Sequence, residues 1–223
     1  MRNIDAVIFD MDGVIFDSEK LVLVCWEKIA EKYHLEGMHE VMMLCIGTTK
    51  VRTKEIVLEH YGDDFPYEEL SAEASVMFHG ICEREGLPIK KGVRELLDYL
   101  KKQNIPTALA SSTRLEVVAQ ELKQAGLYEY FQVVVGGDQL KRSKPAPDIY
   151  LLACEKLGVS PEDAYAIEDS YNGIRSSHSA GMKPVMGPAL LAPTEEMREK
   201  SVVVLEDLLQ ARDWFMAQMK KQI

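Results

Sequence analysis

Short apolar runs alternate with segments of helical periodicity along most of this chain of 223 residues. A brief run of apolar residues without alternation is typical of a strand buried on both faces, as in a parallel sheet. The expected strands are 4–9, 106–111, 131–137, 163–169, 183–187 and 201–206. Because helical segments separate these strands, the pattern predicts an α/β fold with a doubly wound parallel sheet, a Rossmann-like core.

The first two expected strands are separated by a long, wholly helical stretch. Apolar residues recur there at helical spacing, and helices are expected near its start and over 39–45, 49–61 and 66–85. We therefore predict an α/β core made of residues 1–17 and 88–223, interrupted after its first strand by an all-helical insert, 18–87.

Composition and charge exclude several classes of protein. With 47% hydrophobic and 28% charged residues, the chain is typical of a globular protein. Its formal net charge of −10 argues against nucleic-acid and membrane partners. The first apolar run is too short for a signal peptide, and no run is long enough to span a bilayer. The four cysteines lack metal-site spacing, so reduced, buried thiols and a cytoplasmic location are expected.

Two aspartates follow the first expected strand, in the sequence DMDG. Asp10 and Asp12 are two residues apart, so in an extended chain their side chains point the same way, and Gly13 permits a sharp turn. A turn in which Asp12 bonds its own backbone accounts for this segment about as well as a functional site does. A calcium loop does not fit, because its glycine belongs at the sixth position and Gly13 is at the fourth.

Three later segments place polar groups at strand ends or just before helices. Ser111 and Ser112 precede a helix, where hydroxyls and free N–H groups bind anions, although a serine there is more often an N-cap. Lys144 precedes another helix, where a single lysine is usually solvated. Glu168 and Asp169 end the fourth strand. Carboxylates at two buried strand ends are best explained together by a hard cation with oxygen ligands.

These segments together resemble the haloacid dehalogenase superfamily. Its four motifs occur in the same order: D-x-D-G, a strand-terminal Ser or Thr, a Lys, and an acidic pair. DMDGVIFDSE and SKPAPDIY…IEDSYNG are similar to the β-phosphoglucomutase and phosphoglycolate phosphatase branch, in which a helical cap follows the first motif. The resemblance implies a phosphoric monoester hydrolase for a small phosphorylated substrate, with 18–87 as the cap that closes over the site and sets substrate selectivity.

The resemblance also implies the catalytic and metal-binding residues. Asp10 is expected to attack phosphorus and form an aspartyl-phosphate, while Asp12 protonates the leaving alcohol and later takes a proton from the attacking water. Mg²⁺ is the expected cofactor, bound by Asp10, Asp169 and the backbone carbonyl of Asp12. Glu168 either approaches the metal, directly or through water, or orients its neighbours.

Phosphate and substrate contacts follow from the same resemblance. Ser111, Ser112 and Lys144 are expected to bind the phosphoryl group and balance its charge. In the insert, the segment CIGTTKVRTK offers Thr49 and Lys50 as candidate substrate contacts. A basic, solvated helix face accounts for that segment equally well.

Three functions fit these residues. The favoured one is an Mg²⁺-dependent phosphatase for a sugar or polyol phosphate. A β-phosphoglucomutase-type phosphohexomutase is the alternative, but the His and Lys that this branch uses in its cap fall on Val22 and Ile46. A non-catalytic, phosphate-sensing module would have no use for the proton-transferring Asp12.

Overall fold

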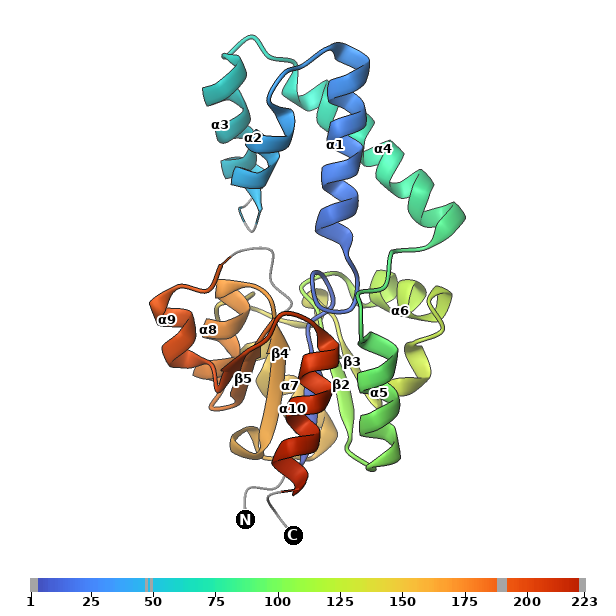
Figure 1. Cartoon of the computed structure of the whole chain (residues 1–223), viewed down its shortest axis with the longest axis vertical. Coiled ribbons are helices and arrows are strands. Elements are labelled where there is room, and N and C mark those ends of the chain that lie inside the picture. Colours follow the sequence, from blue (N-terminus) through green and yellow to red (C-terminus); the bar gives the residue numbers. More distant parts are fainter. Residues whose placement is uncertain (1–3, 47, 49, 188–191, 221–223) are drawn as a thin grey trace. The chain divides into compact units, whose positions relative to one another are not determined.

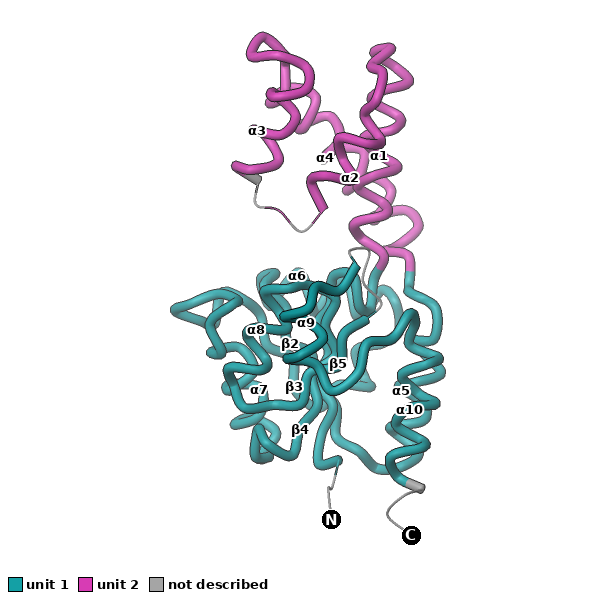
Figure 2. Tube along the Cα trace, turned by 60° about the vertical axis from the view of Figure 1, so that its left-hand side comes forward, with its two compact units in different colours: residues 1–16, 89–223 teal, residues 17–88 magenta. Residues whose placement is uncertain are grey.

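The computed structural model describes residues 4–46, 48, 50–187 and 192–220. The chain forms two compact units, which Figure 2 colours separately. We call residues 1–16 and 89–223 the core unit and residues 17–88 the insert unit. The chain passes from one unit to the other twice, and backbone hydrogen bonds link these two passages. Asp17 N–H donates to the carbonyl of Pro88, and Lys90 N–H donates to the carbonyl of Ile15.

The core unit is built on a six-stranded sheet in which every neighbouring pair is parallel. In spatial order the strands are β3 (Val133–Val135), β2 (Thr107–Ala110), β1 (Ala6–Phe9), β4 (Ala164–Glu168), β5 (Lys183–Met186) and β6 (Val203–Val204). The doubly wound α/β fold expected from the alternating runs is confirmed. Phe9 pairs with Leu109 on one side and Ile167 on the other, so the central strands end at the same level.

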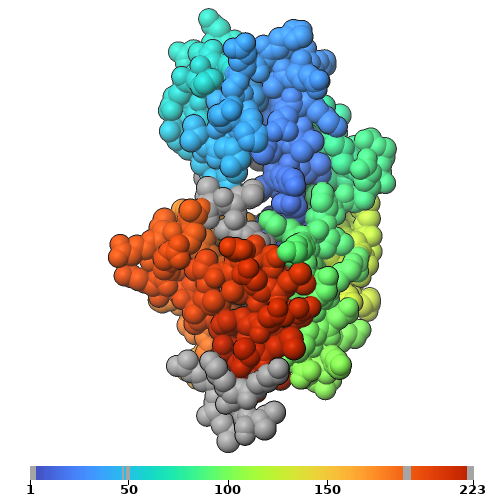
Figure 3. Space-filling model, in the orientation of Figure 1, coloured from blue at the N-terminus to red at the C-terminus, as the bar shows by residue number. Residues whose placement is uncertain are grey.

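Helices cover both faces of this sheet (Figure 1). They are α5 (Val93–Lys102), α6 (Leu115–Gln124), α7 (Asp148–Leu157), α8 (Tyr171–Ser179), α9 (Glu195–Lys200) and α10 (Leu208–Lys220). After β1 the chain adds β2 and β3 on one side of it, and then β4, β5 and β6 on the other side. Because crossovers between parallel strands are right-handed, this change of direction places α5 and α6 on one face of the sheet and α7 and α8 on the opposite face. Helix α10 packs beside α5, seen as adjoining red and green surfaces in Figure 3. The short helix α9 was not expected from the sequence.

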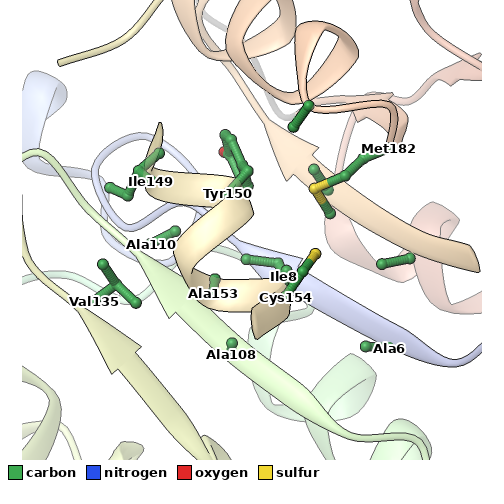
Figure 4. Packing of buried hydrophobic residues seen from close by; sticks show 13 residues of the cluster. Ala6, Ile8, Ala108, Ala110, Val135, Ile149, Tyr150, Ala153, Cys154 and Met182 are labelled. Carbon is green, nitrogen blue, oxygen red and sulfur yellow. The ribbon is translucent and has the colours of Figure 1, made fainter. Parts of the chain in front are cut away.

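Small side chains allow α7 to approach the sheet closely. The sheet face below α7 presents Ala6, Ala108 and Ala110, and α7 contributes Tyr150 and Ala153 to the same buried cluster (Figure 4). Alanines leave room for a bulky residue from the opposite layer, so the dense packing of a protein interior is preserved. As a result, the fully buried Tyr150 is held next to the central strands.

The described residues of the insert unit form four helices: α1 (Ser18–Tyr33), α2 (Met38–Cys45), α3 (Lys50–Tyr61) and α4 (Tyr67–Glu85). It has its own hydrophobic cluster, in which Trp26 of α1 stacks on Tyr67 of α4 with ring centroids 6.0 Å apart. Of the four free cysteines, Cys82 is only partly buried, so the expectation of buried thiols holds for the other three. Among the described residues no helix is long and apolar enough to cross a membrane.

Candidate active site

Three neighbouring strands deliver polar residues to one edge of the sheet. Asp10 directly follows β1, Ser111 directly follows β2, and Glu168 is the last residue of β4. Since β1 lies between β2 and β4 and all three are parallel, these residues meet at the carboxyl ends of the strands. This is the edge at which open α/β sheets bind ligands, at the point where the strand order reverses.

Lys144 joins two of these strand ends. Its Nζ donates hydrogen bonds to Asp10 Oδ1 at 2.5 Å, Glu168 Oε1 at 2.6 Å and the carbonyl of Ala110 at 3.3 Å. An ammonium group has three donors, so all three are used. Burial by itself lowers the pKa of Lys144, but the carboxylates of Asp10 and Glu168 raise it above its ordinary value. Lys144 is therefore a fixed cation, whereas its sequence position alone suggested a solvated charge.

Glu168 is held by residues that the sequence did not single out. The fully buried Glu168 carboxylate accepts hydrogen bonds from the Tyr150 hydroxyl and, at 3.2 Å, from the Ser170 hydroxyl. Gly173 in α8 is also required, because a Cβ there would lie 1.9 Å from Glu168 Oε2. A tyrosine near the start of a helix carries no local signal of this role, which depends on α7 packing over the sheet.

Asp10 is a buried carboxyl group among other charges. Burial raises the pKa of Asp10 to about 7, Lys144 opposes this shift, and the negative charge of Glu168 adds to it. Carboxylate oxygens of Asp10, Glu168 and Asp169 lie within 4.8 Å of one another. Gly13 permits this approach, because a Cβ there would come 1.8 Å from Asp169 Oδ2.

The donor set of this cluster fits a divalent cation. Three carboxylates and the ammonium of Lys144 leave two uncompensated negative charges when all are ionised, which is the charge that a divalent ion neutralises. Hard cations such as Mg²⁺ prefer oxygen ligands, carboxylates among them, and the side chains of this cluster are carboxylates. The oxygens of Glu168 already accept three hydrogen bonds from protein groups, so Asp10 and Asp169 are the better ligands.

Asp12 lies in a different environment from Asp10. It is only partly buried, and its Oδ2 accepts a hydrogen bond of 3.4 Å from the Thr113 hydroxyl. The backbone N–H of Thr113 donates in turn to the Ser111 hydroxyl oxygen at 3.1 Å. The loop after β2 thereby connects Ser111 to Asp12, and the Ser111 hydroxyl keeps its own proton for donation to a ligand. Thr113, next to the two predicted serines, was missed by the sequence reasoning.

Glu121 of α6 adds a second acid with an unusual environment near Asp12. Its Oε2 is buried and has no hydrogen-bond partner in the described part of the chain. Burial, reinforced by the negative charge of Asp12, raises the pKa of Glu121 to about 7. No motif in the sequence pointed to this residue.

The residues predicted from sequence are not all brought together. Asp10, Lys144, Glu168 and Asp169 form one cluster, and Asp12 and Ser111 are linked to each other through Thr113. Ser112 is exposed. Thr49 lies outside the described residues, and Lys50 begins α3 but its side chain is outside them too.

Comparisons with known proteins agree on one family. The family model for haloacid dehalogenase-like hydrolases matches residues 7–186. A phosphorylated carbohydrates phosphatase of Thermotoga maritima is 36% identical over 82% of this chain and 84% of its own length. The β-phosphoglucomutase of Bacillus subtilis is 31% identical over 98% and 99%. A solved HAD family hydrolase from Deinococcus radiodurans R1, with bound phosphate and sodium, is 25% identical over 96% of both chains, with a TM-score of 0.82.

Proposed function

Because the chain belongs to the haloacid dehalogenase-like hydrolase family and is a phosphoric monoester hydrolase, we propose that it is an Mg²⁺-dependent phosphatase that works through an aspartyl-phosphate on Asp10. The observation that carries this proposal is the placement of Asp10: a buried carboxylate at the end of the central strand, fixed by Lys144 at 2.5 Å. A nucleophile must be held in line with the breaking bond, and a carboxylate bonded to a buried lysine is restrained in this way.

In the first half of the reaction an Asp10 oxygen forms a bond to phosphorus while the bond from phosphorus to the alcohol oxygen breaks. Asp12 donates a proton to that leaving oxygen, so a neutral alcohol departs. In the second half, water attacks the aspartyl-phosphate and Asp12 takes its proton, which releases inorganic phosphate and restores both carboxyl groups. The bond from Thr113 to Asp12 Oδ2 supports this role by restraining the group that moves the proton.

The remaining residues balance charge. Mg²⁺, when held by Asp10, Asp169 and the backbone carbonyl of Asp12, would supply positive charge against the phosphoryl oxygens. Lys144 keeps the Asp10 carboxylate in place and offsets its charge, and Glu168 fixes Lys144. Ser111 donates its hydroxyl proton to a phosphoryl oxygen, with Ser112 on the same loop as a further phosphate contact. Electrostatic groups fixed in advance are the main source of catalysis in phosphoryl transfer.

The substrate is a small phosphorylated metabolite, and sugar and polyol phosphates are the first class to test. The phosphorylated carbohydrates phosphatase, which is 36% identical, supports this choice. The insert unit acts as the cap that selects the alcohol part, with Thr49 and Lys50 as candidate contacts. A phosphohexomutase is the second candidate, favoured by the similarity to a β-phosphoglucomutase. The hydrophobic Val22 and Ile46 stand against it, because neither side chain can bind a second phosphate group.

Phosphate release with and without metal tests the proposal. Purified protein is incubated with acetyl phosphate and a panel of sugar and polyol phosphates, in Mg²⁺ or in excess EDTA. We expect phosphate release to require Mg²⁺. We also expect protein that is quenched with acid during turnover of a ³²P-labelled substrate to carry the label. Equal release in EDTA would contradict metal dependence. In a second assay, phosphorus NMR follows the products formed from β-glucose 1-phosphate and a bisphosphate primer. If glucose 6-phosphate forms faster than inorganic phosphate, the result would favour the mutase.

A further inference from the structure

Glu168 and Asp169 are adjacent in the chain but lie in different surroundings. Glu168 is fully buried, whereas Asp169 is only partly buried. Side chains alternate along a strand, so Glu168 points to the same face of β4 as Ala164 and Ala166, which is the face that α7 covers. Mg²⁺ usually keeps several of its waters, so a carboxylate that water can reach is the better ligand. The two acids are therefore suited to different partners.

Tyr150 contacts both members of the ion pair between Glu168 and Lys144. Its hydroxyl donates to Glu168 Oε1, and Lys144 Nζ lies over its ring, 5.2 Å from the centroid, in a cation–π contact. The same Oε1 accepts a hydrogen bond from Lys144 at 2.6 Å, so both lone pairs of this oxygen are used. Tyr150 is itself fixed, because it is fully buried over the small alanines of the sheet (Figure 4).

The second oxygen of Glu168 is restrained as well. Oε2 accepts a hydrogen bond from the Ser170 hydroxyl at 3.2 Å. A Cβ at Gly173 would lie 1.9 Å from Oε2 and 2.1 Å from Oε1, so the backbone of α8 approaches both oxygens closely. To turn toward a cation, Glu168 would have to give up these bonds, and the buried hydroxyl of Tyr150 would lose its acceptor, which costs free energy.

We propose that Tyr150 is a positioning residue that commits Glu168 to Lys144. A divalent ion at this site is then held by two carboxylates, those of Asp10 and Asp169, instead of three. This proposal rests on the metal dependence proposed above and adds a residue that controls it. A site with fewer anionic ligands binds a divalent cation more weakly. Tyr150 therefore lowers the affinity of the site for the metal while it fixes the lysine that holds the nucleophile.

Tyr150→Phe tests this role, because it removes the hydroxyl but keeps the ring beside Lys144. Glu168 can then turn toward the ion, so Mg²⁺ binding, measured by calorimetry and by the Mg²⁺-dependent rise in melting temperature, is expected to tighten about tenfold. At the same time kcat should fall about tenfold, because Lys144 is less well fixed. General damage to the site would instead weaken Mg²⁺ binding, so unchanged or weaker binding in this variant would overturn the proposal. Tyr99→Phe is the control, since the Tyr99 hydroxyl donates to Met219 Sδ on α10 at 3.1 Å, and it should change neither quantity.

A double-mutant cycle tests whether Tyr150 acts through Glu168. In a Glu168→Gln background, Tyr150→Phe should no longer tighten Mg²⁺ binding, because a neutral amide brings no negative charge to the ion. Tightening of the same size in both backgrounds would contradict the proposed route.

Crystals of the unmodified protein grown with Mn²⁺, whose anomalous scattering locates the ion, require no variant. Asp10 and Asp169 are expected in contact with the ion while Glu168 stays on Lys144, and direct ligation by Glu168 would overturn the proposal. If the unmodified protein binds neither ion and hydrolyses acetyl phosphate equally well in EDTA, the metal dependence itself fails and this proposal fails with it. Mg²⁺-dependent hydrolysis combined with an unaltered Mg²⁺ affinity in Tyr150→Phe would contradict only the role of Tyr150.

Discussion

Lys144 Nζ lies 2.5 Å from Asp10 Oδ1 although the two residues are 134 positions apart in the chain. The lysine comes from the loop before α7 and the aspartate from the end of β1. Both side chains are almost fully removed from water, so the Asp10 carboxylate depends on Lys144 for charge compensation. Glu168 shares the same ammonium at 2.6 Å. The stability of this edge of the sheet and the activity of the site are therefore linked through one side chain.

Lys144→Met should be strongly destabilising, because it leaves two buried carboxylates without their cation. Removing one partner of a buried ion pair typically costs about 3–5 kcal/mol. Urea unfolding at pH 7.5 measures the loss in the free energy of unfolding. This loss should be smaller at pH 5, where Asp10 is protonated more readily. Lys141→Met, at an exposed position of the same loop, is the control. A difference of less than about 1 kcal/mol between the two variants would argue against the ion pair.

Asp10→Asn should abolish turnover without weakening the fold. Asparagine keeps the shape of the side chain but cannot form the aspartyl-phosphate, so kcat should fall by about 10³-fold or more. Burial raises the pKa of Asp10 to about 7, so the ionised group is unfavourable there and its removal should leave the melting temperature equal or higher. Steady-state kinetics and thermal unfolding check both parts. Asp64→Asn on the exposed surface is the control, and substantial activity in Asp10→Asn would exclude Asp10 as the nucleophile.

Tyr150→Phe should cost about 1–3 kcal/mol, because Glu168 loses a buried donor that water cannot replace. Tyr33→Phe offers a matched comparison, since the Tyr33 hydroxyl donates to Glu73 at 2.8 Å on the surface, where the loss should stay below about 1 kcal/mol. Denaturant midpoints for the two variants provide the measurement. Equal destabilisation would mean that the Tyr150 hydroxyl has no special role at Glu168.

Asp169→Asn should weaken metal binding more than it weakens the fold. A ligand that binds only the folded state raises its stability by RT ln(1 + [L]/Kd), so Mg²⁺ should increase the melting temperature of the wild-type protein in a concentration-dependent way. Asp169→Asn should shift this response to at least tenfold higher Mg²⁺. Ca²⁺ should raise the melting temperature but inhibit turnover, because its looser coordination misplaces Asp10. An unaltered Mg²⁺ response in the variant would remove Asp169 from the ligand set.

Glu121 should make stability fall as pH rises. Its pKa is about 7 in the folded protein and about 4.5 in the unfolded chain, so between these values the folded state binds more protons and the free energy of unfolding decreases with increasing pH. Because Glu121 is only partly buried, we expect a loss of about 1–2 kcal/mol between pH 4.5 and pH 8 from this group. Glu121→Gln should remove that loss, whereas Glu155→Gln, exposed on α7, should not. Identical pH profiles for both variants would contradict the prediction.

Local sequence determined the elements and their order. Short apolar runs and period-3.6 patterns arise from a residue's own neighbours in the chain, so six strands and most helices were predictable. The polar residues at the ends of β1, β2 and β4 were predictable for the same reason, because carboxylates at the end of an apolar run stand out. These features identified Asp10, Asp12, Ser111, Glu168 and Asp169 as candidates.

Tertiary structure alone decided which of these residues touch. The strand order places β1 between β2 and β4, and this depends on crossovers rather than on any local pattern. Packing of α7 on small alanines brings Tyr150 to Glu168, and the bend after β2 brings Thr113 to Asp12. The sequence around Lys144 suggested a solvated charge, whereas the structure has a buried cation, because the burial of Lys144 depends on segments far away in the chain. Periodicity reports a residue's own element, whereas burial and hydrogen bonding are set by the elements that pack against it.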